Sequence, residues 1–181
     1  MGKRFTEISE KFRAFIEAQK IYFVGTAASE GRVNISPKGM DSLRVLDSNN
    51  VIWLNMTGSG NETATHLLEN KRMTLMFTAF EGNPMIMRLY GEAQVYHPRD
   101  PEWQEHIQAF PITAGARQIF HLKVDLVQTS CGMAVPYYDY VEEREQLKDW
   151  AEKIGPDGVK KYWEEKNQVS LDGKETHIFK K

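Results

Sequence analysis

A glycine-rich segment between an apolar run and a predicted helix holds residues suited to binding a phosphate. Its sequence is Thr57-Gly58-Ser59-Gly60-Asn61-Glu62-Thr63. Glycines let a ligand approach the backbone, and free amides at a helix start can hold an anion together with Ser and Thr hydroxyls. No Lys-Ser or Lys-Thr pair follows, as a P-loop would require, so an ordinary strand-to-helix loop explains the segment equally well.

A second segment, residues 34–39, places a cation beside alternating polar side chains. Asn34 and Ser36 are two residues apart, so in a strand they share one face, and Lys38 follows at the strand end. A lysine there can neutralise a phosphate on a ligand. Pro37 removes a ladder donor, which puts the strand end at an edge or makes it irregular. A solvated loop lysine is the simpler alternative.

The other polar residues indicate less. Arg88 lies in an otherwise apolar strand, where the pattern fits an outward-facing side chain as well as a role in ligand binding or subunit pairing. Cys131 is interpreted as a buried thiol and not as a nucleophile, because no partner can be assigned to it. The five histidines show no metal-binding spacing, and no Gly-x-Ser-x-Gly motif is present. The sequence therefore favours neither a metal site nor a hydrolase.

Strands and short helices alternate along the chain and must position these residues. Apolar residues at helical spacing predict a helix from Ile8 to Ile16 behind a Thr6 N-cap. Strand-forming runs bounded by turn residues predict strands at 21–28, 32–36, 51–55, 73–80, 85–96 and 118–129. Further helices are predicted to begin near Asn61 and Pro101 and to cover 147–154 and 157–163. This order favours a mostly antiparallel barrel or sheet with peripheral helices over a doubly wound parallel sheet.

Composition places the chain among ordinary globular proteins. With 181 residues, 41% of them hydrophobic, it is predicted to form a single domain over residues 1–181. A net charge of -2, with Lys and Arg spread along the chain, argues against nucleic acid as the main partner. The single cysteine, the missing apolar leader and the short apolar runs predict a cytoplasmic protein without a membrane span.

Five motifs occur in an order that identifies a family. They are Ser36-Pro37-Lys38-Gly39, Val51-Ile52-Trp53-Leu54-Asn55, Gly58-Ser59-Gly60-Asn61-Glu62-Thr63, Asn70-Lys71-Arg72-Met73-Thr74-Leu75-Met76-Phe77 and Arg88-Leu89-Tyr90-Gly91. Over about the first hundred residues the chain resembles the FMN-binding split-barrel family related to pyridoxamine 5'-phosphate oxidase. The resemblance implies a six-stranded antiparallel Greek-key split β-barrel, with its core at about 20–132 and a helical region at about 140–167. It also implies a homodimer that shares two FMN sites across the subunit interface.

The same resemblance implies roles for individual residues. Ser36 and Lys38 match a strand end whose basic residue contacts the flavin or its phosphate. Trp53, Leu54 and Asn55 match the strand that lines the isoalloxazine ring, and Ser59, Asn61 and Thr63 match the loop and helix start that receive the phosphate.

Two departures from the family pattern bear on function. Glu62 and Thr63 stand where the oxidase has an Arg-Lys pair, so phosphate binding would depend more on amides, hydroxyls and Lys38. The C-terminal Arg-x-His substrate motif is missing, which argues against oxidation of pyridoxamine phosphate. The resemblance therefore implies an FMN-dependent oxidoreductase acting on another small molecule, with no catalytic residue assigned. The alternatives are a flavin or haem carrier without turnover, and a relative that uses the deazaflavin F420.

Overall fold

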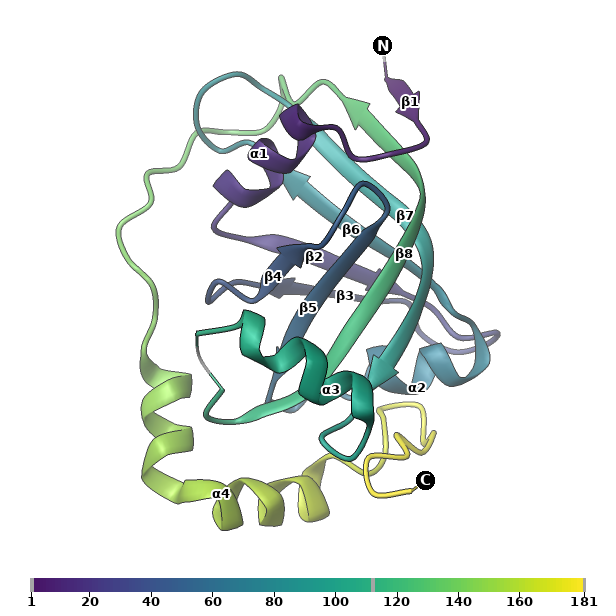
Figure 1. Cartoon of the computed structure of the whole chain (residues 1–181), viewed down its shortest axis with the longest axis vertical. Helices are drawn as coiled ribbons and strands as arrows, with labels where there is room; N and C mark the ends of the chain where they lie inside the picture. The colour runs from purple at the N-terminus through teal and green to yellow at the C-terminus, as the bar shows by residue number, and fades with distance from the viewer. Residues whose placement is uncertain (1, 112, 181) are drawn as a thin grey trace.

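An antiparallel sheet curls into a split barrel in the computed structural model, which describes residues 2–111 and 113–180 (Figure 1). Within those residues the sheet has eight strands in the order β3-β2-β6-β7-β8-β5-β4, with β1 added beside β8. The strands are β1 (Lys3–Phe5), β2 (Tyr22–Thr26), β3 (Asn34–Lys38), β4 (Leu43–Val45), β5 (Asn50–Met56), β6 (Arg72–Thr78), β7 (Ile86–Tyr96) and β8 (Ala116–Ser130). β3 and β4 are therefore the two free edges of the path.

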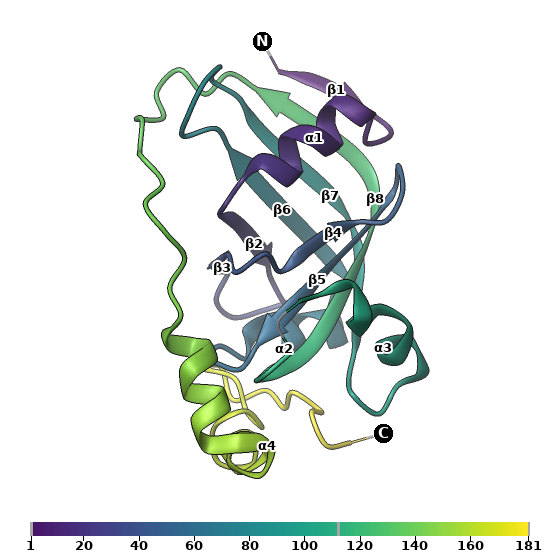
Figure 2. The same cartoon turned by 60° about the vertical axis from the view of Figure 1, so that its left-hand side comes forward.

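Helices cover the outside and the open parts of this sheet (Figures 1 and 2). They are α1 (Glu10–Ala18), α2 (Glu62–Glu69), α3 (Pro101–His106) with the 3-10 turn η1 (Ile107–Ala109), and α4 (Gln146–Lys166). α1 packs on the interior of the barrel, whereas α3 packs on the outer side of β5 and β8. An extended strap, residues 132–145, runs down one side from β8 to α4 (Figure 2).

The helix boundaries follow from local chemistry. α1 begins after Ser9, whose hydroxyl accepts a hydrogen bond from the amide of Phe12. The predicted cap at Thr6 is wrong, because three further residues precede the first helical turn. α4 is two helices that meet at Gly155, where φ is 67° and Pro156 follows, as the sequence pattern of two C-terminal helices predicted.

The interior confirms the predicted fold class. Side chains alternate in and out along the strands, and the inward ones form one apolar cluster that includes the fully buried Val24, Leu75, Leu89 and Phe120. The strand count exceeds the expected six because β1 and β4 are added. Each has only three residues, too few to show the alternation by which a strand is predicted.

Candidate functional site

The inward face of the edge strand β3 brings the predicted cation close to an aromatic ring on β5. Asn34, Ser36 and Lys38 are partly buried while the residues between them are exposed, so the three share the inward face. The Nζ atom of Lys38 lies 5.4 Å from the ring centroid of Trp53 on β5. Trp53 is fully buried and stacks on Phe120, with ring centroids 4.4 Å apart. The lysine is thus directed into the barrel and not into solvent.

A second cation, which the sequence did not single out, reaches the same region. Arg117 lies where the pairing of β5 with β8 shifts by one residue, a bulge that redirects a side chain. Its guanidinium is buried and donates to the carbonyl oxygens of Gly58 at 3.1 Å and Gly60 at 2.6 Å. Burial lowers its pKa to about 10. In the sequence, Arg117 is only a basic residue near the start of a strand. Such a residue is common and does not by itself indicate a site.

A carboxylate occupies the start of α2, where a phosphate was expected. Glu62 Oε2 accepts a hydrogen bond from the amide of Asn61 at 3.0 Å, and its Oε1 accepts one from the amide of Leu171 at 3.2 Å. A negative charge is favoured at a helix N-terminus. The carboxylate of Glu62 therefore already supplies part of the negative charge that a bound anion would bring to the start of α2.

The three charges influence one another. Burial, together with the positive charge of Arg117, lowers the pKa of Lys38 to about 8, while Glu62 opposes the shift. Glu62 also opposes the lowering of the pKa of Arg117. We call Lys38, Glu62 and Arg117 the charged triad.

The C-terminal end of the chain closes over the glycine-rich loop. The indole Nε1 of Trp163 donates to the hydroxyl of Thr57 at 2.8 Å. Asn167 is buried, and its side-chain nitrogen donates to Gly58 O and to Asn61 Oδ1, both at 2.9 Å. Asn61 in turn donates to the carbonyl oxygens of Lys166 and Val169. We call residues 163–176 the clasp, because this segment holds the loop and the start of α2 together.

Several buried donors near the triad have no acceptor. Among the described residues, Ser36 Oγ, Trp53 Nε1 and Arg117 Nε are buried without a hydrogen-bond partner. Burying such groups without partners is unfavourable. The cation of Lys38 adds to this excess of donors, so these side chains suit a ligand that is anionic and rich in acceptor atoms.

The other predicted site residues have varied surroundings. Asn55 faces the interior and donates to Gln118 Oε1 at 3.1 Å, whereas the side chain of Leu54 packs on the outer side with α3. Ser59 is exposed at the loop. The hydroxyl of Thr63 accepts a hydrogen bond from Asn34 at 3.2 Å, which ties α2 to β3.

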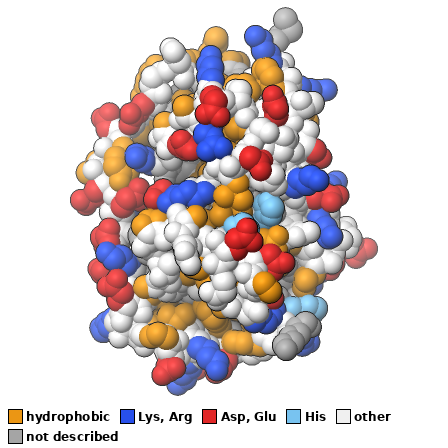
Figure 3. All heavy atoms as spheres, viewed as in Figure 1, with side chains coloured by type: hydrophobic (Ala, Val, Ile, Leu, Met, Phe, Trp, Pro, Cys, Tyr) orange, Lys and Arg blue, Asp and Glu red, His pale blue; other side chains and the backbone are white. Residues whose placement is uncertain are grey.

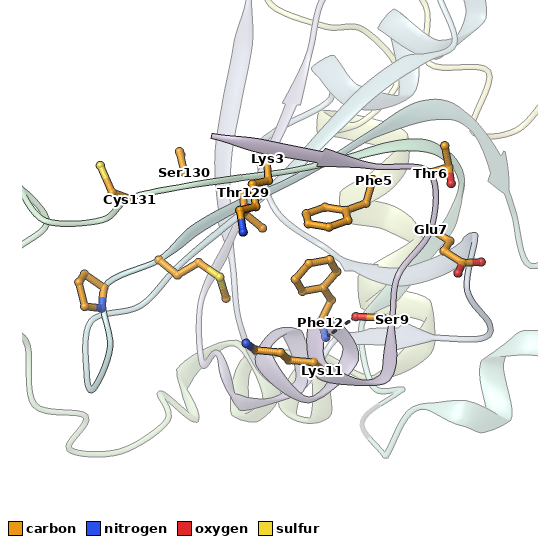
Figure 4. A pocket seen from close by; sticks show the side chains of 12 residues that line it. Lys3, Phe5, Thr6, Glu7, Ser9, Lys11, Phe12, Thr129, Ser130 and Cys131 are labelled. Atoms are coloured by element: carbon orange, nitrogen blue, oxygen red, sulfur yellow. Dashed lines mark hydrogen bonds between the residues drawn. The ribbon is translucent and has the colours of Figure 1, made fainter. Parts of the chain in front are cut away.

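A cavity lies elsewhere, between β1, α1 and the end of β8 (Figure 4). Its volume is about 710 Å³, and its lining includes Phe5, Phe12 and Cys131 but none of the predicted site residues. Cys131 is exposed there, so the expected buried thiol is wrong. Cys131 follows Ser130, the last paired residue of β8, so the sheet no longer buries it.

Metal-ligand clusters and membrane-spanning helices are absent from the described part of the chain. No three His, Cys, Asp or Glu side chains gather there as metal ligands. None of its helices combines the length and apolarity needed to span a bilayer. The face in Figure 3 shows acidic and basic side chains close together, without a broad field of one sign.

Comparison with known proteins decides the family. The family model described as pyridoxamine 5'-phosphate oxidase matches residues 8–131, more than half of the chain. The chain belongs to the pyridoxamine 5'-phosphate oxidase family. A curated member, the family protein ustO of Aspergillus flavus, is 36% identical over 146 residues, which cover 78% of this chain. The chain spans only 59% of the length of that relative.

Solved structures of the family share the fold. A histidine-to-alanine variant of HupZ from Group A Streptococcus matches with a TM-score of 0.57 and 18% identity, over 68% of this chain and 99% of HupZ. A Lactobacillus delbrueckii protein described in terms of pyridoxamine 5'-phosphate oxidase matches with a TM-score of 0.53 and 19% identity, over 68% of this chain and 94% of its own. Identities this low support the common split barrel and nothing finer.

Proposed function

We propose that this family member binds FMN between β3 and β5, beside Lys38 and Trp53, and acts as a flavin-dependent oxidoreductase on a small molecule. The observation that carries the proposal is the excess of donors around Lys38, including Trp53 Nε1 and Arg117 Nε, which have no acceptor in the described residues. FMN presents carbonyl, ring-nitrogen and phosphate acceptors together with negative charge. When bound, the flavin supplies hydride or electron transfer at its N5.

The residues of the chain have binding and orienting roles in this proposal. Lys38 contributes positive charge toward the flavin or its phosphate, and its partial burial makes that charge effective. Trp53 and Asn55 form the wall beside the ring, while the backbone at Leu54 continues the same strand. Ser36, Ser59 and Thr63 supply hydroxyl groups, and Asn61, which the clasp holds through its side-chain amide, positions the loop. No side chain of this set is required to transfer a proton.

The same proposal includes a homodimer with the FMN sites at its interface, which pairs through the outer face of β2, β3, β6 and β7; the edge strand β3 also carries Ser36 and Lys38. A groove of about 710 Å³ crosses this face. Val33 and Ile35 on its rim are 71% and 69% exposed, and Arg88 and Glu92 supply charges of both signs. A twofold interface needs a self-complementary surface, and mixed charge around apolar residues provides one. Light scattering should give the mass of a dimer, and Ile35→Asp should shift it toward the monomer.

A flavin titration tests the proposed cofactor. The purified protein with added FMN should show a perturbed flavin absorption band and micromolar or tighter binding. Lys38→Ala should weaken binding by about tenfold or more, because an unpaired cation near an anion contributes on the order of 1–2 kcal/mol. Lys123→Ala, which removes an exposed lysine on β8, is the matched control and should change nothing.

Turnover separates the oxidoreductase from the alternatives. Flavin-dependent consumption of a reduced pyridine nucleotide with an artificial electron acceptor supports an enzyme. Flavin binding without such a rate would indicate a carrier. Binding of F420 or haem with no affinity for FMN would contradict the proposed cofactor.

A further inference from the structure

The carboxylate of Glu62 holds the position at the start of α2 toward which a phosphate would be drawn. Its two oxygens accept hydrogen bonds from the amides of Asn61 and Leu171 at 3.0 and 3.2 Å. The first amide belongs to the helix start and the second to the clasp. The side chain is therefore fixed from both sides and is not a free surface acid.

The same carboxylate lies near Arg117, whose guanidinium donates to Gly60 O and Asn61 Oδ1, next to the amide that Glu62 accepts from. It shifts the pKa values of both Lys38 and Arg117 in the direction expected of a nearby negative charge. Arg117 is 4% exposed, and its Nε has no partner among residues 2–111 and 113–180. Its other nitrogens donate to the loop carbonyls beside this helix start. A second anion at this place would be repelled by Glu62 across a partly buried space, where charges are weakly screened.

We propose that Glu62 is an intramolecular counter-ion that lowers the affinity of the site for the phosphate of a flavin. This inference rests on the proposed function and adds a specificity-determining residue to it. The site then discriminates little between FMN and riboflavin, and it releases FMN readily. The flavin behaves as an exchangeable ligand instead of a permanently held group.

Binding of two flavins to two variants tests the inference. Glu62→Gln removes the charge but keeps an oxygen that can accept one of the two amide hydrogen bonds. FMN should bind to it about tenfold more tightly than to the parent, whereas the affinity for riboflavin should change less than about twofold. Glu81→Gln makes the same change of net charge in an exposed turn and should alter neither affinity. Thermal unfolding of all three proteins checks that each is folded.

The outcomes separate this inference from the proposed function. Unchanged or weaker FMN binding by Glu62→Gln, or an equal gain for riboflavin, overturns the role of Glu62 even if the parent binds FMN. If no variant binds either flavin, the proposed function fails. Inorganic phosphate is then the probe: a larger thermal stabilisation of Glu62→Gln than of the parent retains the inference, and equal or absent stabilisation overturns it.

Discussion

The interior of the barrel has an apolar region and a polar region that meet at Trp53. In the apolar region, Val24, Leu75 and Leu89 fill the space between the sheet and α1 with no polar atom to satisfy. In the polar region, the charged triad lies near β3 and β5, and the clasp covers the adjoining glycine-rich loop. The first region is complete without a ligand, whereas the second leaves donors without acceptors among the described residues. Stability and binding are therefore assigned to different parts of one interior.

The largest expected effect is on the apolar region. Leu75→Ala removes a fully buried side chain and should lower the free energy of unfolding by about 3 kcal/mol, because a cavity forms. Urea unfolding measures this loss. The affinity of the folded protein for FMN should stay within about twofold of the parent. A large loss of affinity would show that the two regions are not separable.

A substitution in the clasp should lower the free energy of unfolding by less than Leu75→Ala does. Asn167→Ala removes a buried donor to Gly58 O and Asn61 Oδ1 and leaves each of them with Arg117 alone, so the free energy of unfolding should fall by about 2 kcal/mol. Gln168→Ala, at the exposed neighbouring position, is the control and should be nearly neutral. If both variants unfold at the same urea concentration, the clasp contributes no stability.

Lys38→Met should increase the stability of the protein, whereas the two preceding substitutions should lower it. The pKa of Lys38 is lowered to about 8 chiefly by burial, so at pH 7 the folded protein bears a cost for keeping this lysine charged. Removing the charge should raise the free energy of unfolding by about 1 kcal/mol while FMN affinity falls. If Lys38→Met lost both stability and FMN affinity, Lys38 would contribute to the stability of the fold as well as to binding.

The smallest effect is a pH dependence. Lys38 in the free protein is protonated below about pH 8 and loses its proton above that value, since its pKa is lowered. FMN affinity should therefore be level below pH 8 and weaken by up to about tenfold per pH unit above it. Titrations at pH 7, 8 and 9 measure the slope, and Lys38→Met should remove it. A slope that persists in the variant would place the titrating group elsewhere.

Local pattern predicted most of the fold, and long-range contacts explain what it missed. The strand ending at Tyr96 and the helix beginning at Pro101 follow from alternation and capping, which are visible within a short stretch of chain. Lys38 was found because its strand alternates. Arg117 and Asn167 were not, since Arg117 is 59 residues from its partner Gly58 and Asn167 is 106 residues from Asn61. Hydrogen bonds between residues so far apart in the sequence leave no periodic signal in it.

The pairing of β1 with β8 also means that β1 is synthesised well before the strand with which it pairs. Lys3 lies opposite Thr129, so β1 leaves the ribosome long before its partner strand is made. At ordinary rates of translation the interval is roughly 6–25 seconds. During that time Phe5, which later lies 4.8 Å from Phe12 between ring centroids, has no sheet to join. The nascent chain must therefore carry an unpaired N-terminal strand until β8 emerges.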